Sequence, residues 1–391
     1  MSNLKYTRQR MLEKSGKSAF GEALIAPLIP TAAWLFAYNI NTEIVDVTTA
    51  TGGTVTQDAG RAVLQTSAAA GGLAKINTKR SLRYTPGIGG AARFTVVFDT
   101  PAAGAVQLIG IGNGTDALAY GYNGLDFGTL RRRGGVDVWD ISDQWSERLH
   151  TTLGKRINTS LGNVLQIYYQ WLGYGGLMYF AEEPSTGDTA LVHMIKYANT
   201  STDVSVLNPT LPIFASVENA SNDTNITLRT SSAVAGFHGW PMSAEHHPMN
   251  LHRTHYTSLA VTTEAAVLTI SNKVSYAGVS NRVGSQPVSL SVTTDGNKSV
   301  RIRGVLDTTL GGTPSWTDYH TTNSPVEYDE AGTTLAGGDE IFTLGLSKSD
   351  SIIIDLKQYT NPLLPGQTLT VSAQSSASNT VDVALSWDDL F

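Results

Sequence analysis

Large apolar residues alternate with small or polar ones in short runs from residue 32 to the end of the chain. A period of two is typical of β-strands with one buried face. Glycine-containing pairs such as Gly52-Gly53, Gly71-Gly72 and Gly175-Gly176 separate the runs at the spacing of sandwich turns. The pattern predicts an all-β protein whose first sandwich, jelly-roll-like, covers residues 31–237.

The clearest local pattern lies between Arg93 and Trp145, and its centre is a predicted β-hairpin. Two alternating runs meet at Asn123-Gly124, a pair that readily adopts the positive φ values of a two-residue turn. With that turn, Tyr122 would face Leu125 and Tyr120 would face Phe127. The bulky residues would then share one packed face, while the small residues would take the other and suit close packing against a neighbouring sheet or subunit.

A second β-rich segment covers residues 258–391. Its end carries Val381, Val383, Leu385 and Trp387 at a period of two, after a Ser-Ala-Ser-Asn turn. This predicts a terminal hairpin and a second β-sandwich. The domain prediction is an arm over 1–30, a first sandwich over 31–237, a His-rich linker over 238–257 and a second sandwich over 258–391.

The N-terminal segment differs from the rest because it is basic and lacks strand-like alternation. It is either a solvated tail or a peg that docks on a larger assembly. Five cations would make the docking contact: Lys5, Arg8, Arg10, Lys14 and Lys17.

Composition narrows the classes of function. The chain has 391 residues, 27 Lys+Arg against 33 Asp+Glu, and a net charge of −6, so no broad basic surface favours nucleic acid or an acidic membrane as partner. It contains no cysteine, which excludes disulfides and cysteine-based metal or redox sites. Without a signal-peptide pattern or a long apolar run, we expect a protein made in a cytoplasm and not embedded in a membrane.

Residues 237–257 contain five of the eight histidines. Imidazole rings of His246, His252 and His255 are weak candidates for a zinc or nickel site, with Glu245 nearby. The spacing matches no H-E-x-x-H helix, and Pro248 interrupts a helical alignment. We therefore expect an interdomain linker, with no metal and no cofactor.

Catalytic motifs are missing from the sequence. There is no G-x-S-x-G, and cysteine nucleophiles are excluded. Paired carboxylates could serve a glycosidase, with Asp137, Asp140 and Asp143 on one arm and Glu182-Glu183 on another, but such pairs are common on sandwich edges and loops. We expect no enzymatic activity.

Two features could bind ligands without catalysis. The run Arg131-Arg132-Arg133 could hold phosphate or an acidic sugar, or could form a solvated strand end or a subunit contact. Exposed aromatic rings stack well on sugars, and alternation directs Ile167, Tyr169 and Trp171 to one face and Tyr168 to the other. The candidate glycan contacts are Tyr168, Tyr174, Trp316 and Tyr319.

Several long strings resemble a family of virion structural proteins of tailed bacteriophages and large DNA viruses. They include IGIGNGTDALAYGYNGLDFGTLRRRGGVDVWD, GNVLQIYYQWLGYGG and LLPGQTLTVSAQSSASNTVDVALSW, in one order over residues 30–391. The family has no established catalytic or binding residues that could be carried over to this chain.

The resemblance implies a component of the virion, made in the host cytoplasm. The leading hypothesis is a non-enzymatic surface protein, either a capsid decoration or a tail appendage, anchored by its arm to other virion proteins as a homo-oligomer. One alternative is a carbohydrate-binding protein that attaches to a host surface glycan. Another is a depolymerase of surface polysaccharide.

Overall fold

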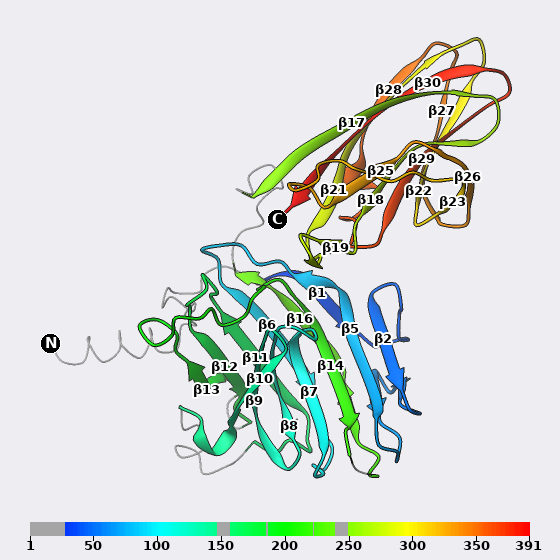
Figure 1. Ribbon diagram of the computed structural model, residues 1–391. Helices are drawn as coiled ribbons and strands as arrows, with labels where there is room; N and C mark the ends of the chain where they lie inside the picture. Colours follow the sequence, from blue (N-terminus) through cyan, green and yellow to red (C-terminus); the bar gives the residue numbers. More distant parts are fainter. Residues whose placement is uncertain (1–27, 147–156, 185–186, 222, 239–248) are drawn as a thin grey trace. The chain divides into compact units, whose positions relative to one another are not determined.

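The computed structural model describes residues 28–146, 157–184, 187–221, 223–238 and 249–391. The chain divides into two compact units, Met1–Pro241 and Met242–Phe391. Both are built from antiparallel strands, without an α-helix among the described residues, as the alternating pattern predicts (Figure 1).

In the first unit, two large sheets form a β-sandwich. The six-stranded sheet runs in the order β1 (Leu28–Leu35), β16 (Ser232–His238), β6 (Gly90–Val96), β11 (Asn163–Tyr169), β12 (Leu177–Glu182) and β13 (Thr189–Ile195). The seven-stranded sheet runs in the order β10 (Val136–Ile141), β9 (Asp126–Arg133), β8 (Ala117–Asn123), β7 (Ala105–Gly112), β14 (Leu211–Asn219), β5 (Gly72–Leu82) and β2 (Val45–Ala50). A small sheet adds β15 (Thr227–Thr230), β4 (Arg61–Gln65) and β3 (Thr54–Asp58).

The core of the first unit lies between the two large sheets. Phe94 and Ile167 come from one sheet and Ile109 and Tyr120 from the other, and all four are in one buried cluster. The alternating side chains of both sheets therefore supply a single apolar layer, as expected for a sandwich.

The second unit is also a sandwich with a core of its own. Its four-stranded sheet runs β17 (Asn250–Val261), β30 (Asn379–Leu390), β21 (Gly284–Asp295) and β28 (Ser351–Asp355). The six-stranded sheet runs β24 (Thr317–Asp318), β25 (Val326–Asp329), β18 (Ala265–Asn272), β29 (Thr368–Ser375), β22 (Val300–Leu306) and β27 (Asp339–Leu346). Two ribbons pair β19 (Ser275–Tyr276) with β20 (Val279–Ser280) and β23 (Thr309–Gly312) with β26 (Gly332–Ala336), and 3₁₀ turns cover Ser142–Gln144 (η1) and Leu356–Gln358 (η3).

Both predicted terminal strands form, as β29 and β30, but they do not pair as a hairpin. Strand β29 pairs with β18 and β22 in the six-stranded sheet, whereas β30 pairs with β17 and β21 in the four-stranded sheet, so the turn between them leads from one sheet to the other. Val381, Val383, Leu385 and Trp387 are fully buried on one face of β30. Period-two alternation therefore identified both the strand and its buried face.

The central hairpin forms, but its register differs from the prediction. Asn123 pairs with Asp126, Tyr122 with Phe127 and Tyr120 with Thr129, so the turn is Gly124-Leu125. Gly124 takes the positive φ of +61°, and Leu125 lies exposed. The pairing slips by two residues, so the side chains of the strands keep their predicted faces, whereas Leu125 moves from the packed face into the turn. The Tyr122 and Phe127 rings lie 5.2 Å apart.

Two boundaries also differ from expectation. Strand β17 starts at Asn250, so residues 250–257 of the predicted linker pair with β30 in the second unit. Strand β1 starts at Leu28, inside the predicted arm. Strand β5 has a polar outer face with Lys75 and Asn77, whereas Ala74 and Ile76 alternate with them and are fully buried.

The small face of the hairpin lets neighbouring strands approach within the sheet. A Cβ at Gly121 would overlap the carbonyl oxygen of Gln107 on β7, and one at Gly128 would crowd Asp140 on β10. The close neighbour of this face is therefore the adjacent strand of the same sheet.

We expect Gly121→Val to destabilise the protein by about 1–3 kcal/mol or more, because β7 must move away from β8. Denaturant unfolding of the purified variant measures the loss. Gly114→Val is the matched control, since a Cβ there meets no atom within 4 Å. Equal stability of the two variants would contradict the packing role of Gly121.

Candidate functional site

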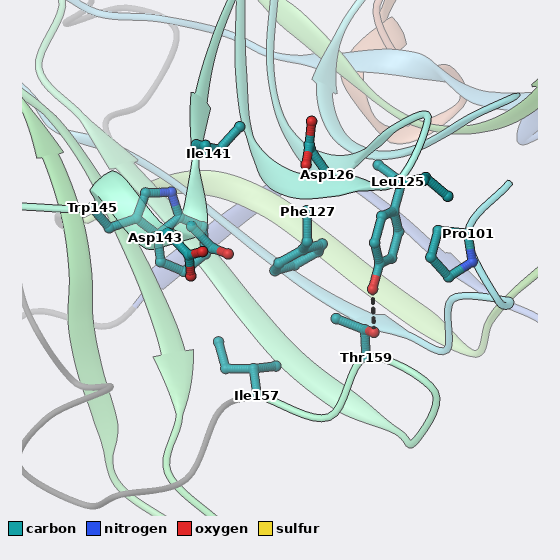
Figure 2. Close-up of a pocket in the computed structure, with 11 residues that line it drawn as sticks. Pro101, Leu125, Asp126, Phe127, Ile141, Asp143, Trp145, Ile157 and Thr159 are labelled. Atoms are coloured by element: carbon teal, nitrogen blue, oxygen red, sulfur yellow. Dashed lines mark hydrogen bonds between the residues drawn. The ribbon is translucent and has the colours of Figure 1, made fainter. Parts of the chain in front are cut away.

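A pocket of about 280 Å³ opens in the first unit beside the tip of the β8–β9 hairpin (Figure 2). Its lining combines aromatic, aliphatic, hydroxyl and carboxylate side chains. The lining residues are Pro101, Tyr122, Leu125, Asp126, Phe127, Ile141, Ser142, Asp143, Trp145, Ile157 and Thr159. Small-ligand sites typically have such an apolar wall with a few polar groups.

Three aromatic rings shape the wall of the pocket. Phe127 lies 5.2 Å from Tyr122 and 5.9 Å from Trp145, measured between ring centroids. The Tyr122 hydroxyl forms a 2.7 Å hydrogen bond with the Thr159 hydroxyl, which fixes one side of the opening (Figure 2). The hairpin register therefore determines the wall, because it sets Tyr122 opposite Phe127.

Trp145 follows η1 and is held on several sides. Its Nε1 donates to the carbonyl oxygen of Asp140 over 3.0 Å, and its ring stacks on His193 at 6.4 Å. His193 Nδ1 accepts from the backbone N–H of Ser146 over 3.1 Å, while Nε2 lies 3.4 Å from the Asp140 carboxylate. The indole is thus positioned before any ligand arrives, which lowers the entropy cost of binding.

Two carboxylates complete the lining. Asp126 stands at the hairpin tip and Asp143 lies in η1 beside Trp145, and both are exposed (Figure 2). No cation among the described residues forms an ion pair with Asp126. The pocket therefore offers acceptor oxygens next to aromatic faces.

The tyrosines behind the pocket do not supply acid–base chemistry. Burial raises the pKa of Tyr120 and of Tyr179 well above the ordinary value of 10.0. Both hydroxyls remain protonated donors, and the Tyr120 hydroxyl donates to the carbonyl oxygen of Phe180 over 2.9 Å.

The predicted glycan contacts belong to both units and differ in exposure. Tyr168 is half-buried against Phe180, whereas Tyr174 is exposed and donates to the Thr202 carbonyl oxygen. In the second unit, Trp316 is exposed, whereas Tyr319 packs edge-on against Trp387 at 4.8 Å.

The arginines of the predicted basic run form ion pairs and hydrogen bonds within the first unit. Arg132 forms a bidentate pair with Asp137, and Arg133 pairs with Asp203. Arg131 donates to the Ser205 carbonyl oxygen. The arginine run therefore anchors loops of its own unit, and of the acidic residues weighed from sequence only Asp143 lines the pocket.

The weak metal candidates are not brought together. His252 and His255 lie three positions apart on β17 and so point to opposite faces. His252 lies 2.9 Å from Asp388, and His255 lies 2.9 Å from Glu330. His246 and the docking residues Lys5, Arg8, Arg10, Lys14 and Lys17 lie outside the described residues.

The described residues lack two features, a cluster of metal ligands and a membrane-spanning helix. They contain no group of three or more His, Cys, Asp or Glu side chains arranged to hold a metal ion. They also contain no helix long and apolar enough to cross a membrane.

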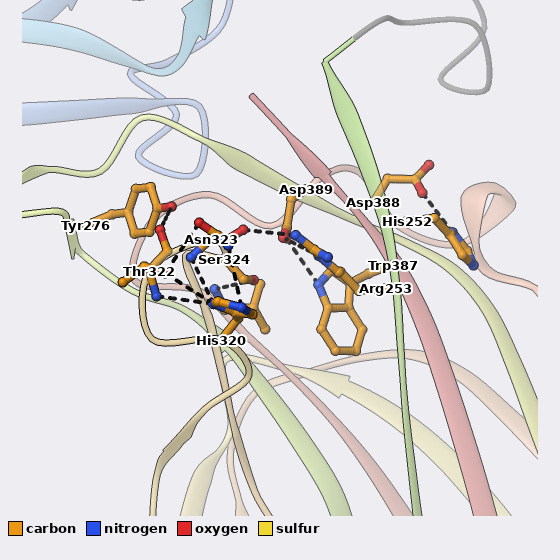
Figure 3. Close-up of polar contacts among 11 residues, drawn as sticks. His252, Arg253, Tyr276, His320, Thr322, Asn323, Ser324, Trp387, Asp388 and Asp389 are labelled. Carbon is orange, nitrogen blue, oxygen red and sulfur yellow. Dashed lines mark hydrogen bonds and ion pairs between the residues drawn. The ribbon is translucent and has the colours of Figure 1, made fainter.

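A polar network in the second unit is structural (Figure 3). Asp389 is fully buried, accepts from Trp387 Nε1 over 3.1 Å and lies 3.3 Å from Arg253. Arg253 also donates to the Asn323 carbonyl oxygen over 2.9 Å. The network fastens β17 to β30 and to the loop before β25.

Pocket residues Phe127 and Trp145 were not predicted as ligand contacts. Phe127 was assigned to the core, and Trp145 stood at the end of a strand pattern. Their positions in the sequence match no binding motif, because the pocket forms only when η1 folds beside the hairpin tip.

Comparisons with known proteins give structural neighbours alone. No protein-family model and no curated protein sequence matches the chain. A glycosyl hydrolase family protein from Mycobacterium fortuitum has 12% identity and a TM-score of 0.37, covering 53% of this chain and 100% of that one. The Crh5 transglycosylase in complex with NAG has 14% identity and a TM-score of 0.38, covering 59% and 90%. A β-1,3-glucanase from Mycobacterium marinum has 12% identity and a TM-score of 0.34, covering 57% and 96%.

These neighbours correct one expectation. The prediction of a protein without enzymatic activity is contradicted, because the structures similar to this chain include glycosyl hydrolases and glucanases. At these identities the likeness concerns the fold, so it assigns no reaction to this chain.

The pH dependence of stability should report the burial of Asp389. Burial raises the pKa of Asp389 above its ordinary value of 3.8. The folded protein then binds this proton more tightly than the unfolded chain does, so the contribution is fully present below pH 3.8 and is lost as the pH rises through the folded value. We expect the stability of the wild type relative to Asp389→Asn to increase from pH 7 to pH 3.5, measured by urea unfolding. A relative stability that stays constant or falls would contradict this.

Proposed function

We propose that the first unit binds carbohydrate in the pocket at the β8–β9 tip. The observation that carries the proposal is the lining itself, in which Phe127 and Trp145 lie beside the exposed carboxylates of Asp126 and Asp143. Sugars present apolar C–H faces that pack on aromatic rings and hydroxyl groups that donate to carboxylate oxygens. The lining matches both parts of such a ligand.

The size of the pocket restricts the ligand. A volume of about 280 Å³ lies near the lower end of the range for small-molecule sites, about 300–1,000 Å³. We expect the pocket to take one or two sugar residues, such as the end of a glycan chain. This supports the hypothesis of a protein that recognises a surface glycan.

Hydrolysis of the bound glycan is a second candidate. It is favoured by the two carboxylates in one pocket, since glycosidases use a pair of Asp or Glu residues, one as acid and one as base or nucleophile. Incubation of the wild type with a polysaccharide that it binds, followed by a reducing-end assay, tests this. New ends that disappear in Asp143→Asn support hydrolysis, and their absence from the wild type leaves binding alone.

The virion setting remains a prediction that rests on the resemblance of the sequence. If the protein is a virion component, binding of a host surface glycan would give it a role in host attachment. Removal of residues 1–20 should leave a folded protein that no longer joins particles. Incorporation of the truncated protein at normal occupancy would contradict the anchoring role of the arm.

Trp145→Ala should weaken glycan binding about 10-fold, or about 1.4 kcal/mol, because part of the aromatic wall of the pocket is lost. Asp126→Asn keeps the shape of the pocket and should weaken binding by a smaller factor. A screen against a set of host-surface oligosaccharides, followed by calorimetry with the best ligand, measures both effects.

Trp316→Ala in the second unit is the matched control, since this exposed tryptophan was itself a predicted glycan contact. It should bind like the wild type. Unchanged affinity in a folded Trp145→Ala variant, or loss of binding in Trp316→Ala, would contradict the proposal that the pocket is the binding site.

A further inference from the structure

Strand β17 is the longest edge strand in the described part of the chain. It has 12 residues, whereas the edge strands β1 and β27 have 8 each and β2, β10 and β28 have 6, 6 and 5. Its register with β30 is continuous from Asn250 to Val261. At about 3.3 Å per residue, it presents an edge of roughly 40 Å.

The edge lacks Pro, Lys and bulges, which usually protect edge strands, and its inward-pointing Arg253 is paired with Asp389. The sequence of β17, NLHRTHYTSLAV, contains no Pro, Gly, Lys, Asp or Glu. The other long edges differ, because β1 carries Pro30 beside a register shift and β27 meets β22 across one. An unprotected edge of this length is a template for another strand.

The edge is also held rigid. Arg253 lies 3.3 Å from the buried Asp389 and donates to the Asn323 carbonyl oxygen, so β17 is fixed against its own sheet (Figure 3). On the outward face, the Tyr256 hydroxyl donates to Asp382 over 3.1 Å. A partner strand would therefore meet a preformed backbone edge.

We propose that β17 pairs antiparallel with β17 of a second copy of this chain across a two-fold axis. Facing residues of antiparallel strands point to the same side of the sheet, so the axis must pass through a residue position. The axis at Tyr256 brings together the two exposed Tyr256 rings, Thr254 with Ser258 of the partner, and Arg253 with Leu259 of the partner.

Charge favours a second copy as the occupant. Arg253 is the sole Lys, Arg, Asp or Glu in β17, and at this register it faces an apolar residue. Self-pairing therefore opposes no like charges, which are unfavourable in facing positions. The pairing joins two four-stranded sheets into one continuous sheet of eight strands.

The full-length wild type should sediment as a dimer at about 100 µM, and Thr254→Lys/Ser258→Lys should sediment as a folded monomer. The two lysines face each other twice across the axis, and both sites are exposed. The matched control is Ser351→Lys/Ile353→Lys on the opposite edge strand β28, which should remain dimeric.

A cross-link tests the register independently. The chain has no cysteine, so Tyr256→Cys introduces a single thiol. Mild oxidation should give a covalent dimer, whereas Ile353→Cys, also exposed, should not cross-link. A monomeric wild type, a dimer that survives the β17 lysines, or equal cross-linking of the two cysteine variants would overturn the proposal.

Discussion

The hydroxyl of Tyr120 joins the two sheets of the first unit across its core. It lies on β8 of the seven-stranded sheet and donates to the Phe180 carbonyl oxygen on β12 of the six-stranded sheet. Its ring lies 5.4 Å from Tyr179 and 6.2 Å from Trp145, both edge-on. Because burial keeps the hydroxyl protonated by raising its pKa, the donor is permanent. The position of Trp145, and with it the pocket, depends on this link.

The two units fill and close their cores with different kinds of side chain. The first unit fills its interior with aromatic rings whose polar ends find partners across the core, and the buried Trp145 among them also lines the pocket. The second unit uses an aliphatic stripe on β30, closed by the buried carboxylate of Asp389. Strand β17 pairs with β30 along one edge only. Its other edge has no partner strand among the described residues.

Much of the fold could be predicted from local pattern, but register could not. Tyr120 and Tyr122 are on the expected face, yet the turn lies one residue later than Asn123-Gly124 indicates, because packing of Phe127 against Tyr122 outweighs the local turn preference. Residues 250–257 were predicted as part of a linker because polar residues occupy both faces of this half-exposed edge strand, which hides the alternation typical of a strand.

By itself, the sequence determined that the chain is all-β, which side chains face inward, and that cysteine chemistry is excluded. Those properties depend on neighbours one or two positions away and on composition. Only the tertiary structure decided that Asp126, Asp143, Phe127 and Trp145 share a pocket, that His252 and His255 lie on opposite faces, and that β17 is an open edge. The pocket depends on how η1 folds beside the hairpin tip, and the faces of the two histidines depend on β17 being a strand. The open edge depends on which distant strand lies alongside, and a period of two along the chain carries no information about that partner.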